Sequence, residues 1–290
     1  MDGRPGRRAR AAIAAALPQP TARRLQREAA RKRRTRRQTA VSAVSTLAVL
    51  GALAALILTS EGWPTVKDTF FNPSDFADSF PAVLKGFWLD VKLFCIIEVG
   101  VLILGLLIAL ARISRAPALF PLRLLSSVAV DVLRGIPVIL VIYLIGFGVP
   151  ALELTGVPTD PVVLGGFGLL LSYTAYVAEV YRSGIASVHP SQRQAALAVG
   201  LTPNQATRHV VLPQAVRRVI PPLLNDFISL QKDVALISIL GPLEAFRVAQ
   251  IEASSNFNYT PLLAAAALYL LVTVPLARVV DRLERRRAAR

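Results

Sequence analysis

The chain has 290 residues, of which 54% are hydrophobic and only 18% are charged. A soluble domain of this size rarely combines such a composition with a mean hydropathy of +0.53, so we expect a membrane protein. One cysteine excludes an intramolecular disulfide, and two histidines in one polar loop leave no catalytic triad and no histidine metal cluster. Hydrolytic chemistry, catalytic residues and a bound metal are therefore not expected in this chain.

Residues 1–39 form a basic tail with thirteen Lys and Arg against two acids, which gives it +11 of the chain's net charge of +15. Clustered arginines also bind the phosphates of nucleic acids. An apolar run follows this tail at once, however, so anchoring at a membrane face and attraction to anionic lipid headgroups explain the charge more simply. We expect a disordered cytoplasmic tail that binds lipid and no nucleic acid.

Apolar windows close to the length needed to cross a bilayer recur along the chain. We predict an all-α fold with six spans, at about 41–59, 88–111, 119–149, 162–183, 216–240 and 261–280. The third window is long enough to tilt or to bend at Pro137.

The charges of the connecting segments predict the direction of the spans, because Lys and Arg accumulate on the cytoplasmic side. The segment 60–87 has four acids against two lysines, whereas 112–123 has three arginines and no acid. The loop 150–161 is acidic, and the polar stretch between the fourth and fifth spans is rich in arginine. Both termini and that polar stretch are therefore predicted to lie in the cytoplasm.

The polar stretch 187–213 is predicted to form two short helices joined by a turn. Pro190 and Pro203 each suit a first helical position, and Gly200 suits the end of the first helix. Thr202 and Gln205 have the spacing of a capping box. The small side chains of the first helix favour close approach by another protein, although an ordinary solvated loop has a similar composition.

The spacing within this stretch resembles the EAA loop of permease subunits in ATP-binding-cassette importers. The residues that carry the match are Gln194, Ala195, Ala196, Gly200, Val210, Leu212 and Pro213. In that family the helical part couples to the ATPase subunit, so the resemblance implies the same role here for about 190–211. Gln194 departs from the family's usual Glu.

The resemblance extends over 84–287 to the histidine/glutamine-type branch of polar amino-acid importer permeases. It is carried by residues 131–137 (DVLRGIP), 175–184 (AYVAEVYRSG), 225–227 (NDF), 232–233 (KD) and Gly241. It implies a five-span permease domain at 86–287, preceded by an additional span at 40–60 and an extracytoplasmic segment at 61–85. The task of the additional span cannot be read from the sequence.

Charged side chains within the spans are expensive in a bilayer, so each should face a partner or a water-filled path. Asp131 and Arg134, like Glu179 and Arg182, are three residues apart and share a helix face. We expect Arg134, beside backbone that Gly135 and Pro137 unwind, to contact a substrate carboxylate, with Asp131 as its resting partner.

Three further acids are candidates for the pathway. Glu98 is the candidate for a substrate amino group, and Asp226 and Asp233 are seven residues apart on one face of a helix. A structural role for these charges, locking helix against helix, is the simpler alternative.

The sequence is thus interpreted as a permease subunit that carries a polar or charged amino acid through the bacterial cytoplasmic membrane. It has no phosphate-binding Gly-Lys motif, so ATP and Mg²⁺ are expected on a partner ATPase. The resemblance implies a second permease, identical or homologous, two ATPase subunits and an extracytoplasmic amino-acid-binding protein. Two rivals remain: an ion-coupled secondary transporter with a relay through Asp131, Glu98 and Asp226, and a non-transporting membrane scaffold.

Overall fold

The computed structural model describes residues 22–114 and 116–288, which fall into two units, divided between Thr65 and Val66. The first unit consists mainly of helix α2 (Ala22–Leu58). Its apolar part, about 41–58, is exposed along its length and has the length and hydropathy of a membrane span.

Helix α2 begins at Ala22, so the expectation of a disordered tail up to residue 39 is wrong for 22–39. The reason is local. This part contains eight Arg, three Ala and two Gln, which are good helix formers, and no Pro or Gly interrupts it before the apolar span. Extending an existing helix needs no new nucleus. Residues 1–21 lie outside the described part of the chain.

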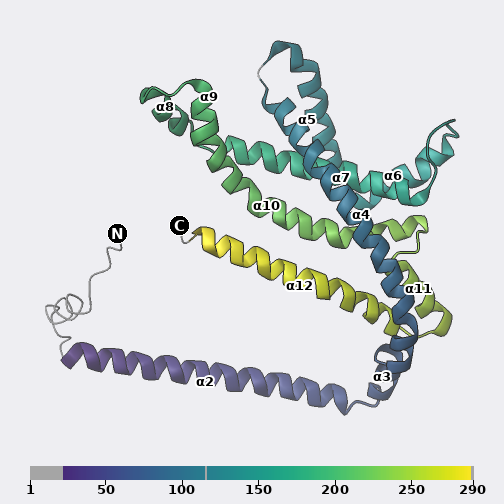
Figure 1. Cartoon of the computed structure of the whole chain (residues 1–290). Helices are drawn as coiled ribbons and strands as arrows, with labels where there is room; N and C mark the ends of the chain where they lie inside the picture. Colours follow the sequence, from purple (N-terminus) through teal and green to yellow (C-terminus); the bar gives the residue numbers. More distant parts are fainter. Residues whose placement is uncertain (1–21, 115, 289–290) are drawn as a thin grey trace, which may run out of the picture. The chain divides into compact units, whose positions relative to one another are not determined.

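The second unit consists of helices joined by turns and loops, with no strand among its described residues, and Figure 1 shows α4, α7 and α10 crossing near its middle. Its elements are the greater part of α3 (Trp63–Phe70), α4 (Pro73–Ile113), η1 (Pro117–Leu119), α5 (Phe120–Gly135), α6 (Val138–Ala151), α7 (Pro161–Ala186), α8 (Pro190–Ala198), α9 (Pro203–Ala206), η2 (Thr207–Val211), α10 (Leu212–Asp233), η3 (Val234–Leu240), α11 (Ala245–Asn256) and α12 (Thr260–Ala288).

The described part of the chain has four helices that are long and apolar enough to cross a membrane: α2, α4, α7 and α12. Two helix pairs pass the same test only when each is taken together: α5 with α6, bent by 106°, and α9–η3 with α11, bent by 53°; counting each pair as one span gives six. This is compatible with the six predicted windows. Of the two alternatives predicted for the third window, a tilt or a bend at Pro137, the structure shows the bend. Helix α4 starts at Pro73, well before the predicted span at 88, because Asn72 caps its first turn.

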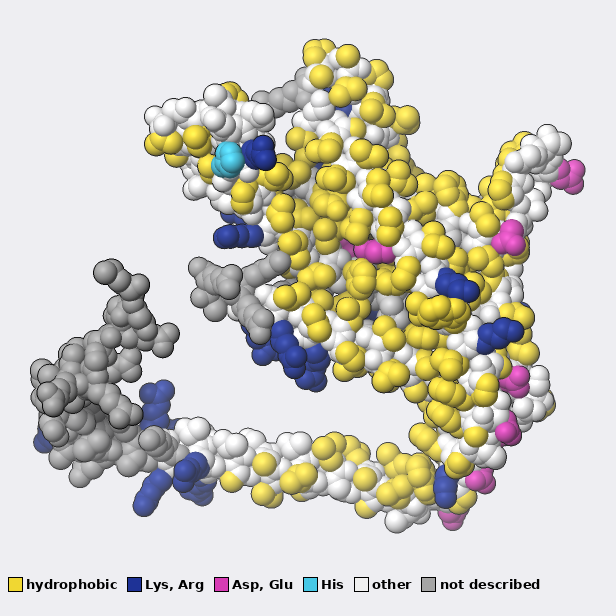
Figure 2. Space-filling model, in the orientation of Figure 1, with side chains coloured by type: hydrophobic (Ala, Val, Ile, Leu, Met, Phe, Trp, Pro, Cys, Tyr) yellow, Lys and Arg dark blue, Asp and Glu magenta, His cyan; other side chains and the backbone are white. Residues whose placement is uncertain are grey.

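The largest apolar core lies where α4, α6, α7, α10 and η3 meet. Its buried members are Ile97, Val101, Ile142, Leu169, Tyr173, Val177, Leu230, Val234 and Ile237. Outside this core, hydrophobic side chains dominate the face of the unit shown in Figure 2, and many large ones are more than half exposed. An apolar exterior of this extent is what a lipid-facing helix bundle requires.

Candidate functional site

Arg134 stands immediately before the break between α5 and α6. Arg134 lies in the last turn of α5, and Ile136 after it has an extended backbone (φ −102°, ψ 134°). Pro137 disfavours helical geometry at the preceding residue, which explains why the helix stops there. The Arg134 side chain remains 40% exposed, so its guanidinium is accessible.

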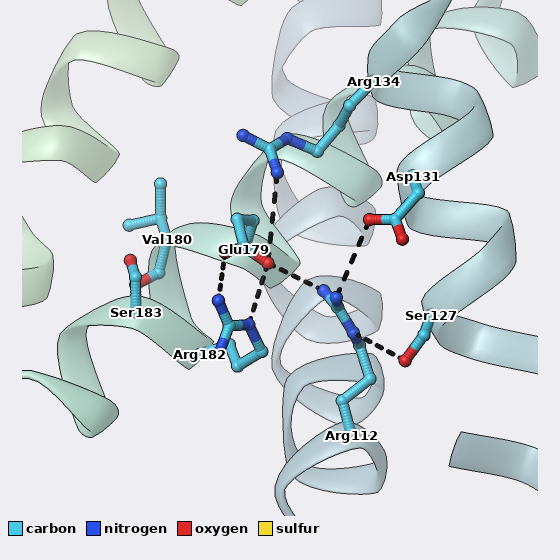
Figure 3. Close-up of polar contacts among 8 residues, drawn as sticks. All are labelled: Arg112, Ser127, Asp131, Arg134, Glu179, Val180, Arg182 and Ser183. Carbon is cyan, nitrogen blue, oxygen red and sulfur yellow. Dashed lines mark hydrogen bonds and ion pairs between the residues drawn. The ribbon is translucent and has the colours of Figure 1, made fainter. Parts of the chain in front are cut away.

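Glu179 on α7 is the centre of a charge cluster that joins three helices (Figure 3). Its Oε2 accepts hydrogen bonds from Arg112 Nη1 at 2.8 Å and from Arg182 Nε at 2.9 Å. Arg134 Nη1 lies 4.0 Å from the same oxygen. Arg112, on α4, also donates from Nε to Ser127 Oγ on α5 at 3.3 Å. One carboxylate therefore holds guanidinium groups from α4, α5 and α7.

The Glu179–Arg182 pair expected from spacing is confirmed, but the pairing of Arg134 with Asp131 is wrong. The Asp131 side chain is 71% exposed and its Oδ1 lies 4.0 Å from Arg112 Nη2. Arg134 instead approaches Glu179 and lies over the ring of Tyr176, 6.0 Å from its centroid. Because α7 crosses α5 beside Arg134, Glu179 on α7 is closer to Arg134 than Asp131, which is three positions back on α5.

The three candidate acids belong to one polar region beside the main core. Tyr173, on α7, donates its hydroxyl to Asp233 Oδ2 at 2.7 Å. Asp226 interacts electrostatically with Glu98 on α4 and with Arg134 on α5. Glu98 is only 8% exposed. The fold therefore brings residues from α4, α5, α7 and α10 into one electrostatic neighbourhood.

Asp226 has an unused hydrogen-bonding atom. Its Oδ2 is buried and has no hydrogen-bond partner among the described residues. A buried polar atom left unpaired is costly, so it favours a ligand or water at that position. Together with the accessible Arg134, this arrangement offers one cationic group and nearby acidic groups, which is the chemistry that recognises a zwitterion.

A second buried acidic pair was not singled out from the sequence. Glu244 is fully buried and caps α11 through bonds from the N–H groups of Phe246 and Arg247. Asp90, 2% exposed, accepts the hydroxyl of Tyr269 at 2.8 Å. These groups tie α4 and α12 to the start of α11. The interruption of the second apolar window by Asp90 was the available signal for such a site.

The polar stretch 187–213 folds as predicted at its starts and at its turn. Pro190 and Pro203 are the first residues of α8 and α9, and Gly200 between them has φ +92°. The capping box is present: Gln205 N donates to Thr202 Oγ1 at 3.3 Å, and Thr202 N donates to Gln205 Oε1 at 2.9 Å. The capping box pairs backbone N–H groups at the start of α9, directly after the turn at Gly200.

The end of this stretch is different from a simple second helix. Helix α9 continues through the π-helical turn η2 into α10, where Leu212 N donates to the Thr207 carbonyl. Pro213 has no N–H for the regular helical bond, and a wider turn accommodates that loss. Gln214 Nε2 donates to Gln192 Oε1 at 3.3 Å, which ties α8 to α10.

The small residues of α8 divide between two surroundings. Ala195 is exposed, as are Gln194 and Gly200, but Ala196 is only 6% exposed because it packs inside the chain. Ala196 is therefore a packing residue of the two-helix unit and not an outer contact, as the sequence had suggested. The exposed apolar side chains here are Leu197 and Val199, 38% and 80% exposed. They are the better candidates for contact with a partner.

Comparison with known proteins agrees with this architecture. The family model described as "Binding-protein-dependent transport system inner membrane component" matches residues 101–289, more than half of the chain. The probable glutamine ABC transporter permease protein GlnM of Bacillus subtilis is 33% identical to this chain. The match covers 74% of this chain and 97% of the length of GlnM. The glutamine transport system permease protein GlnP of Escherichia coli K12 is 31% identical over 72% of this chain and 94% of the length of GlnP.

Solved structures show the same fold. The crystal structure of an amino acid ABC transporter with histidines is 31% identical, with a TM-score of 0.64 over 71% of this chain and 94% of that one. The inward-facing MetNI methionine ABC transporter is 19% identical with a TM-score of 0.53, which shows a shared fold. The chain is thus a multi-pass membrane protein that belongs to the family of binding-protein-dependent transport system inner membrane components.

Proposed function

We propose that this chain is the permease subunit of an ATP-binding-cassette importer that carries a polar or charged amino acid. The observation that supports this most directly is the burial of Glu98 and of the unpaired Asp226 Oδ2 in a bundle where Arg134 remains accessible. A carboxylate of the substrate would bind at Arg134, and its amino group would be attracted by the acids. The names of the relatives, which include glutamine permeases, support this substrate class.

The stretch 187–213 couples transport to ATP hydrolysis on separate ATPase subunits in this proposal. It stands at the end of α7 and the start of α10, outside the apolar spans, and its caps and turn make it rigid. A rigid element can pass a displacement from a partner to two helices at once. Leu197 and Val199 supply the apolar contact.

The same proposal gives the orientation and the partners. Both termini and α8 lie in the cytoplasm, in agreement with the excess of Lys and Arg in these segments. A second permease, identical or homologous, completes the pathway, and an extracytoplasmic binding protein delivers the amino acid. ATP and Mg²⁺ bind the ATPase subunits only.

The test is uptake by proteoliposomes that contain this chain with its ATPase and binding protein. Uptake of a labelled amino acid should require ATP on the ATPase side and should persist when an ionophore collapses the ion gradients. Loss of uptake with the ionophore while ATP is present would instead favour an ion-coupled transporter.

A further inference from the structure

A cavity lined by three arginines opens where α4 ends and α5 begins, beside the last turns of α7. Its volume is about 300 Å³. The lining residues are Arg112, Phe120, Arg123, Leu124, Ser127 and Arg182. Neither the pathway acids nor the coupling segment contributes to it, whereas Arg112, Ser127 and Arg182 also belong to the Glu179 charge cluster.

The cavity has more positive charge than its acidic neighbours neutralise. Arg112 and Arg182 both bond to the carboxylate of Glu179, and Arg112 also lies 4.0 Å from Asp131 Oδ1. Arg123 donates to the backbone carbonyl of Ser114 at 3.1 Å and lies 5.2 Å from the centroid of Phe120. It forms no ion pair with any residue in the described part of the chain. An anion in the cavity would therefore meet an uncompensated guanidinium.

The rim of the cavity is apolar on the α5 side. Phe120, Leu124 and Val128 are spaced four residues apart on one face of α5, and each is 52–55% exposed. A soluble anion would gain nothing from contact with this apolar surface. An anion attached to hydrocarbon chains would place its charge among the arginines and its chains along this face.

We propose that this cavity binds the phosphate of an anionic glycerophospholipid such as phosphatidylglycerol. Arg123 is its principal cation, Arg112 and Ser127 supply further donors, and the acyl chains lie along α5 over Phe120, Leu124 and Val128. Guanidinium groups bind phosphate through paired N–H donors, and a charge at the membrane surface strengthens the contact with anionic lipid. The bound lipid would hold the α4–α5 turn against α7.

The test compares the full chain with Arg123→Gln and with Arg217→Gln, which removes an exposed arginine outside the cavity. Each protein is purified in detergent and titrated with phosphatidylglycerol, phosphatidylcholine or inorganic phosphate, with native mass spectrometry and the thermal midpoint as readouts. The midpoint without lipid checks that each variant is folded. Arg123→Gln should bind phosphatidylglycerol roughly fivefold more weakly, the effect of one basic residue at a membrane surface.

The outcomes separate the possible occupants. Selective retention of phosphatidylglycerol by the wild type and by Arg217→Gln, with a loss in Arg123→Gln, supports the proposal. Equal retention by all three proteins overturns it. If inorganic phosphate stabilises the wild type as strongly as the lipid does, and only Arg123→Gln loses the effect, the occupant is a free anion and the lipid assignment fails.

Discussion

Arg134 Nη1 lies 4.0 Å from Glu179 Oε2, on the helix that crosses α5 and not on α5 itself. At this distance the contact is a weak ion pair and not a hydrogen bond. Glu179 is already bonded to Arg112 and Arg182, so it needs no third cation. Arg134 is therefore available to another carboxylate at little cost.

Arg134→Gln should lower ATP-dependent uptake and leave assembly with the ATPase intact. A hydrogen bond to a charged group contributes about 1.5–3 kcal/mol, which corresponds to a loss of roughly 10- to 100-fold in uptake efficiency. The loss is measured from uptake kinetics in proteoliposomes, with Arg217→Gln as the control. Normal transport with a lowered thermal midpoint would show that Arg134 is structural.

Glu179→Gln should destabilise the bundle more than any other neutralisation in the charge cluster. The substitution leaves Arg112, whose side chain is 9% exposed, without its main counter-charge. Removing one partner of a buried pair costs about 3–5 kcal/mol, and the 19% exposure of Glu179 places the loss at the lower end. Asp131→Asn is the matched control, because its exposed contact contributes less than about 1 kcal/mol. Thermal unfolding in detergent measures both variants. Equal thermal midpoints for Glu179→Gln and Asp131→Asn would contradict this account.

Gly86→Ala should weaken the packing of α4 on the start of α11. An added Cβ would lie 2.7 Å from the backbone N of Ala245, and the backbone there is held by the Glu244 cap. Overpacking of this kind costs about 1–3 kcal/mol. Gly148→Ala, where a Cβ would meet no atom within 4 Å, serves as the control and should be neutral or slightly stabilising in the same thermal assay.

The proposed orientation predicts which loops react with an impermeant thiol reagent in intact cells. In a Cys95→Ser background, Thr155→Cys should be labelled from outside and Asn204→Cys should be labelled only after lysis. Both positions are exposed in the structure, so burial would not explain protection. If only Asn204→Cys is labelled in intact cells, the proposed orientation is wrong and the opposite one holds.

Features that depend on local chemistry could be predicted from the sequence, and features that depend on helix crossings could not. The bend at Pro137, the cap at Thr202 and the start of α8 at Pro190 follow from residues within one turn of each other. The contact of Glu179 with Arg112 depends instead on where α4 crosses α7. The burial of Ala196 depends likewise on the packing of α8 against α9 and η2, which the alanine-rich sequence around it does not reveal.

Gly200→Val should separate coupling from folding. Gly200 has φ +92°, a conformation that costs a residue with a Cβ about 1–2 kcal/mol, although a Cβ there would meet no neighbouring atom. The strain is therefore in the backbone of the turn, and it should change the angle between α8 and α9 without affecting the spans. We expect normal amounts of protein in the membrane, weak binding of the ATPase and no stimulation of ATP hydrolysis by substrate.

Gly200→Asn is the control for this prediction, because Asn tolerates the left-handed conformation better than other residues with a side chain. It should retain most of the coupling, whereas a β-branched residue should not. Co-purification of the ATPase and the rate of substrate-stimulated hydrolysis measure both variants. If Gly200→Val supports normal ATP-dependent uptake, the angle between α8 and α9 does not transmit the ATPase movement, and the stretch is only a solvated connection between α7 and α10.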